Sequence, residues 1–142
     1  MRLATTPAGA AARLTMAVSA LEAGRYAEVP PLVQKVRGQL SRIDDYLAYF
    51  QASALAGLGR HADALTALEP VWRQQPISPV AGRAAMLASR SLLALGRAEE
   101  AAHIVEKYDA QVYHPQADLL AAEAWLAAGN RPKAGVYFAR IY

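Results

Sequence analysis

Apolar residues recur every three to four positions along most of this chain, which is the spacing of one face of an α-helix. The clearest runs lie at residues 48–58, 65–72, 85–95 and 119–126. Residues with a preference for extended structure gather only at 77–80 and 111–113, and these patches are too short to build a sheet. The pattern therefore predicts a series of amphipathic helices and an all-α fold.

Four glycines divide the helical runs at nearly regular intervals of about 35 residues. They are Gly24, Gly59, Gly96 and Gly129. Each follows one helical run and precedes another, so we expect two helices per interval, joined at the glycine. The predicted first helices cover residues 10–23, 44–58, 79–95 and 115–128, and the predicted second helices begin at Pro30 or cover 62–75, 98–110 and 132–142.

These helix pairs resemble tetratricopeptide repeats, a family with a small residue mid-way along each first helix and a defined pattern along each second helix. The small residues here are Ala17, Ala52, Ser89 and Ala122, and the second-helix pattern is followed by Ala64, Leu68, Val71 and Pro76, by Ala101, Val105 and Tyr108, and by Ala134, Phe138 and Ile141. The first pair departs from it, with Val29 in place of the early alanine. The resemblance implies a right-handed superhelix of eight helices in four pairs, with a concave face lined by the first helices.

The length of 142 residues fits one domain, and 54% hydrophobic residues are enough to bury a continuous core. We expect residues 1–9 to be a flexible leader and residues 10–142 to form a single solenoid domain. Solenoids need polar terminal caps, and none follows Tyr142. The sequence therefore predicts a fragment of a longer protein, or self-association through the apolar C-terminal end.

The net charge of +3 comes from arginines that are dispersed along the chain. Nucleic-acid-binding proteins concentrate basic residues in a patch or stripe, so no nucleic acid is expected as a partner. RNA binding by a related two-helix repeat would need polar residues repeated at fixed places in each first helix, and these are missing. No stretch of about 18 apolar residues lacks a charge, so no membrane insertion is expected. Bacterial cytoplasm and periplasm both remain open as locations.

No residues have the spacing of a catalytic, cofactor or metal site. The histidines, His61, His103 and His114, share no ligand spacing. Asp44 and Asp45 fall at an expected helix start, where acidic residues interact favourably with the helix dipole. Cysteine is absent, and no serine has an adjacent histidine or an activating motif. We therefore predict no catalytic residue, no cofactor and no metal ligand.

The family resemblance places a binding face on the first helices, in a row set by helical spacing. In this chain the row holds Tyr46, Tyr49 and Ser53, then Arg83, Met86 and Arg90, then Gln116, Leu119 and Glu123. Arginine pairs with carboxylates and tyrosine offers a flat amphipathic surface, so the row suits an extended peptide. The alternative interpretation is that the arginines form salt bridges with Glu123 or face solvent and that the tyrosines pack half-buried.

A second resemblance concerns residues 83–142. Their Ala- and Leu-rich helices with repeated glycine turns look like the solenoid that precedes the catalytic domain of some bacterial lytic transglycosylases, as does the closing run 136–142. The catalytic glutamate motif of that family is absent. Two functions follow as alternatives. One is a non-catalytic scaffold that binds a protein or peptide along its concave face, and the other is an accessory domain of an enzyme that acts on peptidoglycan.

Overall fold

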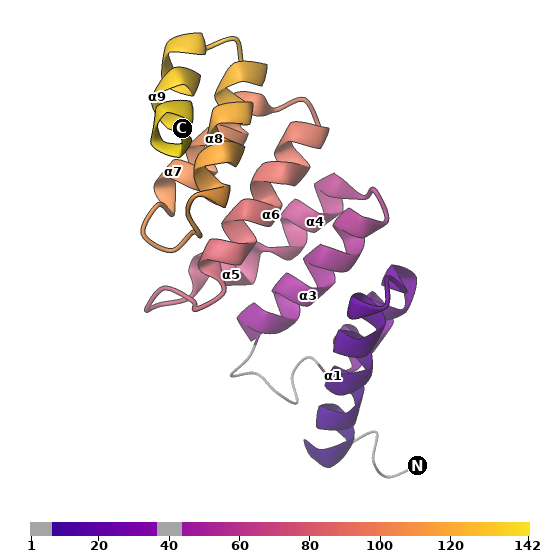
Figure 1. Cartoon of the computed structure of the whole chain (residues 1–142). Helices are drawn as coiled ribbons and strands as arrows, with labels where there is room; N and C mark the ends of the chain where they lie inside the picture. Colours follow the sequence, from indigo (N-terminus) through magenta and orange to yellow (C-terminus); the bar gives the residue numbers. More distant parts are fainter. Residues whose placement is uncertain (1–6, 37–43) are drawn as a thin grey trace. The chain divides into compact units, whose positions relative to one another are not determined.

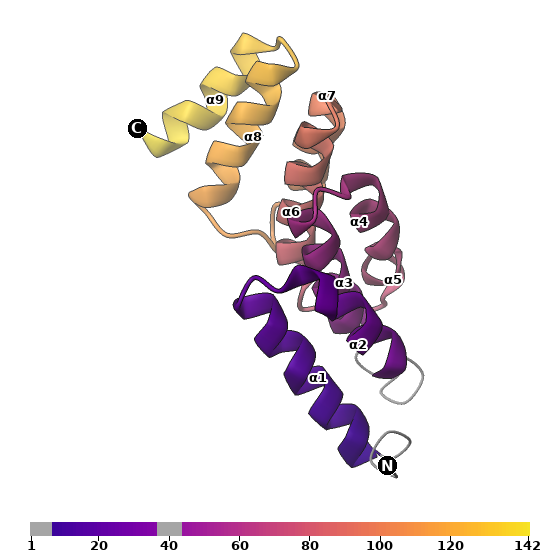
Figure 2. The same ribbon diagram turned by 90° about the vertical axis from the view of Figure 1, so that its right-hand side faces the viewer.

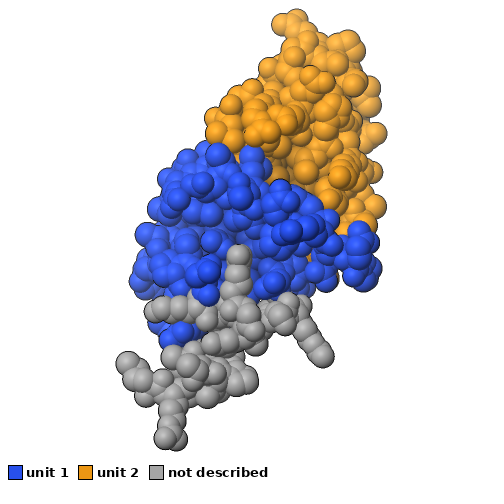
Figure 3. All heavy atoms as spheres, turned by 180° about the vertical axis from the view of Figure 1, so that it is seen from behind, with its two compact units in different colours: residues 1–76 blue, residues 77–142 orange. Residues whose placement is uncertain are grey.

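The computed structural model describes residues 7–36 and 44–142, and every regular element in these two ranges is helical (Figure 1). The predicted all-α fold is confirmed for this part of the chain. The chain divides into two compact units, Met1–Pro76 and Ile77–Tyr142 (Figure 3). Of the predicted leader, residues 1–6 lie outside the described ranges, and the first helix begins at Pro7 rather than near Ala10. Proline suits a first helical turn, because its missing N–H would have no partner there.

The first unit contains two helix pairs. Its elements are α1 (Pro7–Glu22), the 3₁₀ helix η2 (Tyr26–Glu28), α2 (Val29–Val36), α3 (Asp44–Gly57), α4 (His61–Ala67) and α5 (Glu69–Arg73). α1 packs against α2, and both pack against α3, which also contacts α4 and α5 (Figure 2). Small and branched side chains form the core between α1, α2 and α3: Ala17, Ala20, Val29, Val33, Leu47 and Ala54.

The second unit contains two further pairs. Its helices are α6 (Ala81–Ala94), α7 (Ala98–Lys107), α8 (Gln116–Ala127) and α9 (Arg131–Ile141). The two first helices, α6 and α8, lie side by side, and α7 packs against both (Figure 1). α9 packs against α8, and Trp125 of α8 is only 2% exposed. Alanine supplies half of the buried positions of α6 and α8, which lets neighbouring backbones approach closely.

The four marker glycines end the four first helices in the same way. Each has a positive φ, between 77° and 82°. The N–H of the following residue donates to a carbonyl in the last turn of the helix, Arg25 to Ala20, Arg60 to Leu55, Arg97 to Leu92 and Asn130 to Trp125. This is the Schellman motif, which satisfies carbonyls at a helix end. Because a side chain in this conformation costs about 1–2 kcal/mol, the recurrence of glycine has a backbone cause, and the predicted turns are confirmed.

The second helix predicted at residues 62–75 is wrong as a continuous helix, because it divides into α4 and α5 at Leu68. Pro70 causes the division, since it has no N–H to donate and its ring would clash with the carbonyl four residues earlier. The chain turns at Leu68 instead. Its N–H donates to the carbonyl of Leu65, and its own carbonyl accepts from Val71. Leu68 and Val71 stay buried across the turn.

One helix start also differs from the prediction. The helix expected from Pro79 begins at Ala81, because Ser78 first closes a turn by accepting the N–H of Val80 at 3.2 Å. The predicted hand of the superhelix and the single domain at residues 10–142 concern how the two units combine, and both stay predictions.

Candidate functional site

The arginines of α6 lie on a different side of the helix from Ser89, which contacts α7. Ser89 is fully buried, and its hydroxyl donates to the carbonyl of Ala101 on α7 at 2.8 Å. At 3.6 residues per turn, Arg83 and Arg90 lie about 100–120° around the helix from Ser89, and both are exposed. Met86 is only 7% exposed, so it contributes to packing rather than to an accessible surface.

α8 presents a matching row beside α6. Gln116 and Glu123 occupy the repeat positions of Arg83 and Arg90, and both are exposed. Since α6 and α8 lie side by side on α7, the second unit brings these four residues to one face. Within residues 7–36 and 44–142, neither Arg90 nor Glu123 forms an ion pair. The alternative interpretation supposes a salt bridge between the arginines and Glu123. Arg90 does not form that salt bridge.

In the first unit, the predicted residues lie on α3 and are half-buried. The rings of Tyr49 and Phe50 are 6.1 Å apart and tilted by 52°, and Phe50 packs against the core. The hydroxyl of Ser53 donates to the carbonyl of Tyr49 at 2.9 Å. With Tyr46, α3 therefore offers partly exposed aromatic surface, while the Ser53 hydroxyl is occupied within the helix.

Two leucines of α8 are more exposed than their helical spacing suggests. Leu119 is 40% exposed and Leu126 is 49% exposed. Leu126 ends one of the apolar runs that predict the helices, and the predicted binding row does not include it. Apolar residues occur on almost every side of α8, so periodicity does not single out its exposed side. Comparison of equivalent positions in successive repeats is the sequence signal that could have identified the exposed side of α8.

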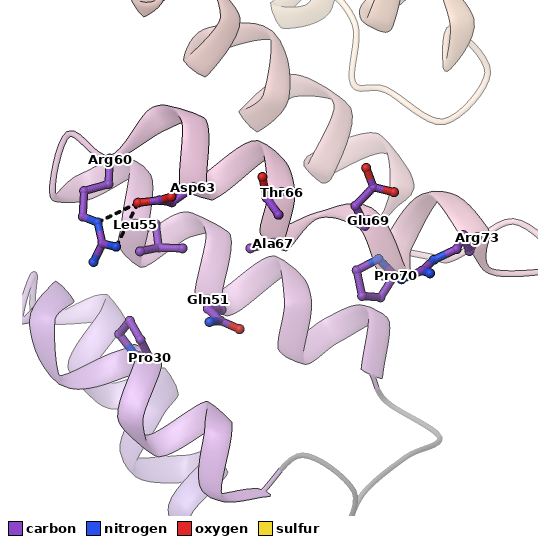
Figure 4. A pocket seen from close by; sticks show the side chains of 10 residues that line it. All are labelled: Pro30, Gln51, Leu55, Arg60, Asp63, Thr66, Ala67, Glu69, Pro70 and Arg73. Carbon is purple, nitrogen blue, oxygen red and sulfur yellow. Dashed lines mark hydrogen bonds and ion pairs between the residues drawn. The ribbon is translucent and has the colours of Figure 1, made fainter.

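The first unit also holds a hollow of about 650 Å³ between α2, α3, α4 and α5 (Figure 4). Leu55 and Ala67 contribute to its apolar lining. At one end, the Arg60 guanidinium lies 2.8 Å from Asp63, and Arg73 lies at the other end (Figure 4). The lining comes from four separate helices, which no local sequence motif reveals. Its charged side chains, Arg60, Asp63, Glu69 and Arg73, are exposed.

Polar contacts join the loop between α7 and α8 to α8 and α9. Asp118 is 6% exposed, and its Oδ1 lies 3.0 Å from His114 Nδ1 and 3.5 Å from Arg140 Nη1. The interaction with Asp118, followed by that with the carbonyl of Asp109, raises the pKa of His114 above its ordinary value. The protonated histidine is thereby favoured beside a nearly buried carboxylate.

Two further contacts hold α9 in place. The Tyr137 hydroxyl donates to Glu106 of α7 at 2.7 Å, and the ammonium group of Lys133 lies 4.2 Å from the centre of the Trp125 ring. Burial, and then the hydrogen bond to Glu106, raises the pKa of Tyr137 well above its ordinary range. A tyrosine that holds its proton this firmly serves as a structural donor.

A search of the described ranges found no cluster of three or more potential metal ligands. No helix within those ranges has the length and apolar character needed to cross a membrane.

The family model of the tetratricopeptide repeat matches residues 46–70 and 82–107. The first segment covers most of α3 and all of α4, and the second covers most of α6 and all of α7. Each match thus coincides with one helix pair. Searches of the curated proteins and of the solved structures found no significant match. The chain therefore contains two tetratricopeptide repeats, at its second and third helix pairs, and the glycine turns of all four pairs share one geometry.

Proposed function

We propose that the chain is a non-catalytic scaffold that binds a segment of another protein along the exposed row of its first helices. One observation supports this most directly. α6 and α8 are buried on most sides, yet they keep long polar side chains exposed in the row where ligands of this family are expected: Arg83, Arg90, Gln116 and Glu123. Because these side chains are exposed, a partner can reach them without disturbing the core.

The chemistry of the row suits a peptide. Arg83 and Arg90 lie two turns apart on α6, about 10.5 Å along the helix axis, and Arg90 can take a carboxylate in a bidentate pair. Tyr46 and Tyr49 add amphipathic aromatic surface in the first unit. Tetratricopeptide repeats generally mediate protein–protein interaction, and the row contains no nucleophile beside a base.

A display library of random peptides, selected against the purified chain, tests this proposal. We expect the selected peptides to bind the double variant Arg83→Ala/Arg90→Ala about tenfold more weakly, the usual effect of losing central interface contacts. Arg131→Ala is the matched control, because this arginine is exposed on α9 and lies outside the row. The Arg131→Ala variant should bind the same peptides with the affinity of the wild type.

Two results would contradict the proposal. One is that selected peptides bind the row variant and the wild type equally well. The other is that no peptide is selected while soluble peptidoglycan fragments bind, which would favour the accessory-domain alternative.

A further inference from the structure

We infer that the segment bound by the exposed row carries an acidic and a basic side chain, two or three residues apart, which pair with Arg90 of α6 and Glu123 of α8. This inference rests on the proposed function, because it takes the row as the binding surface. It adds the chemistry that the row selects, which is one charge of each sign in a fixed order.

Most charged side chains of the second unit already contact another group of the chain. Ion pairs three residues apart follow three of the four glycine turns: Arg25–Glu28, Arg60–Asp63 and Arg97–Glu100. On α9, the Arg140 guanidinium lies 3.5 Å from Asp118, and Lys133 lies over the ring of Trp125. Charges used in this way stabilise the turns and the helix packing, so they are occupied before a partner arrives.

Arg90 and Glu123 differ from these residues. Within residues 7–36 and 44–142, neither side chain forms an ion pair, a hydrogen bond or a ring contact, and both are exposed. Arg83 already has an interaction within the chain. Because arginine and glutamate are charged at neutral pH, the row presents one unbalanced cation on α6 and one unbalanced anion on α8.

The two charges occupy equivalent positions of neighbouring helices. Arg90 and Glu123 stand equally far before the turn glycines Gly96 and Gly129. α6 and α8 lie side by side and run in the same direction (Figure 1), and packed helices are typically about 8–10 Å apart. A segment that crosses from α6 to α8 therefore meets the cation first and the anion second, or the reverse if it runs the other way.

The spacing of the two charges on the segment follows from the geometry of an extended chain. In β conformation, side chains two residues apart lie on one side and are about 7 Å apart. In polyproline II conformation, side chains three residues apart lie on one side and are about 9 Å apart. Either spacing matches neighbouring helices, and the long side chains of Arg90 and Glu123 can adjust to the remainder.

Paired charges of this kind determine order more than affinity. An exposed ion pair contributes little, whereas like charges brought face to face cost considerably more. A segment with its two charges exchanged would set an acid against Glu123 and a base against Arg90. If it turned end to end, it would restore both ion pairs and misplace its other side chains. The row therefore rejects the exchanged segment more strongly than it stabilises the matched one.

Exchange of the charges on both partners tests this inference. One peptide is selected from the random library against the wild type, and its counterpart has the acidic and the basic residue exchanged. Both are titrated into the wild type and into the double variant Arg90→Glu/Glu123→Arg. Each peptide should bind its matched chain about tenfold more tightly than the mismatched chain. The difference should shrink at about 1 M salt, which screens exposed charges.

Arg131→Glu is the matched control, because it reverses a charge that is exposed on α9 outside the row. This variant should keep the preference of the wild type for the selected peptide over its counterpart. Circular dichroism checks that each variant keeps its helical content, as expected for substitutions at exposed positions.

Three results would overturn the inference. Peptides that need Arg83 and Arg90 but contain no acidic and basic pair would leave the row as the binding surface and remove the charge order. Equal affinity of both peptides for both chains would do the same. A wild-type dimer in sedimentation that is lost in Arg90→Glu and restored in the double variant would assign the two charges to a second copy. If no selected peptide depends on the row, the proposed function fails as well.

Discussion

At the scale of single residues, Gly82 is a position in the second unit with no room for a side chain. A Cβ added there would lie 1.9 Å from the carbonyl oxygen of Gln111, in the loop between α7 and α8. The obstacle is backbone, which cannot rotate aside as a flexible side chain would. Glycine is normally about 1 kcal/mol worse than alanine inside a helix. Here the close approach of two backbone segments outweighs that preference.

We predict that Gly82→Ala lowers the free energy of unfolding by about 1–3 kcal/mol, the usual cost of overpacking. Gly135→Ala is the matched control, since a Cβ there meets nothing within 4 Å, and it should raise the free energy by up to about 1 kcal/mol. Urea denaturation followed by circular dichroism measures both. A Gly82→Ala variant as stable as the wild type would show that the loop can move away at little cost.

Gly96 illustrates the opposite situation, a glycine required by the backbone alone. Its φ is +77°, and a Cβ there would have no neighbour within 4 Å. We predict that Gly96→Ala destabilises the chain by about 1–2 kcal/mol. Gly96→Asn should cost less, because asparagine tolerates this conformation better. The thermal midpoints of the two variants give the comparison, and an alanine variant as stable as the asparagine variant would rule out a backbone cause.

These two glycines also show what a sequence can reveal at this scale. Gly96 belongs to a periodic series, so its role as a turn was predicted. Gly82 has no such signal, because the atom that excludes a side chain belongs to a loop distant in sequence.

At the scale of helices and turns, a feature could be predicted from the sequence when residues close to it in the chain cause it. Helix pairs and their glycine turns follow from periodicity and were predicted. The division of α4 from α5 also has a local cause, Pro70, whose effect the apolar spacing of Leu65, Leu68 and Val71 concealed. The exposed side of α8 has no local cause, since it depends on which neighbouring helices cover Leu119 and Leu126.

The contacts of His114 predict a pH dependence for the second unit. Its pKa is raised in the folded chain, so folding favours the protonated form. This stabilisation is fully present below the unfolded-state pKa, about 6.5, and is lost as the pH rises through the higher folded-state value. Because the imidazole is 40% exposed, the contribution should stay below about 1 kcal/mol.

The difference in thermal midpoint between the wild type and His114→Gln should therefore shrink between about pH 5.5 and about pH 8.5. The Asp118→Asn background supplies the control, because removal of the carboxylate should abolish most of that pH dependence. A difference that is constant over this range would show that the pair with Asp118 does not favour the protonated histidine.

At the scale of the whole molecule, the repeat explains why function is expected along a surface rather than in a cavity. Within each unit one helix pair packs against the other. In the second unit a row on the two first helices stays exposed, so a ligand can be contacted by more than one repeat. The sequence predicted this row from family resemblance and helical spacing. It could not predict the burial of Met86, because that depends on how α6 is covered by its neighbours.

The most direct test of peptide binding along the first helices is amide chemical-shift mapping with a library-selected peptide. Our account predicts that the largest shifts fall on the exposed first-helix residues of α6 and α8, around Arg83, Arg90, Gln116 and Glu123, with further shifts near Tyr46 and Tyr49 of α3. Shifts confined to α7 and α9, or to the hollow lined by Leu55 and Ala67, would contradict it.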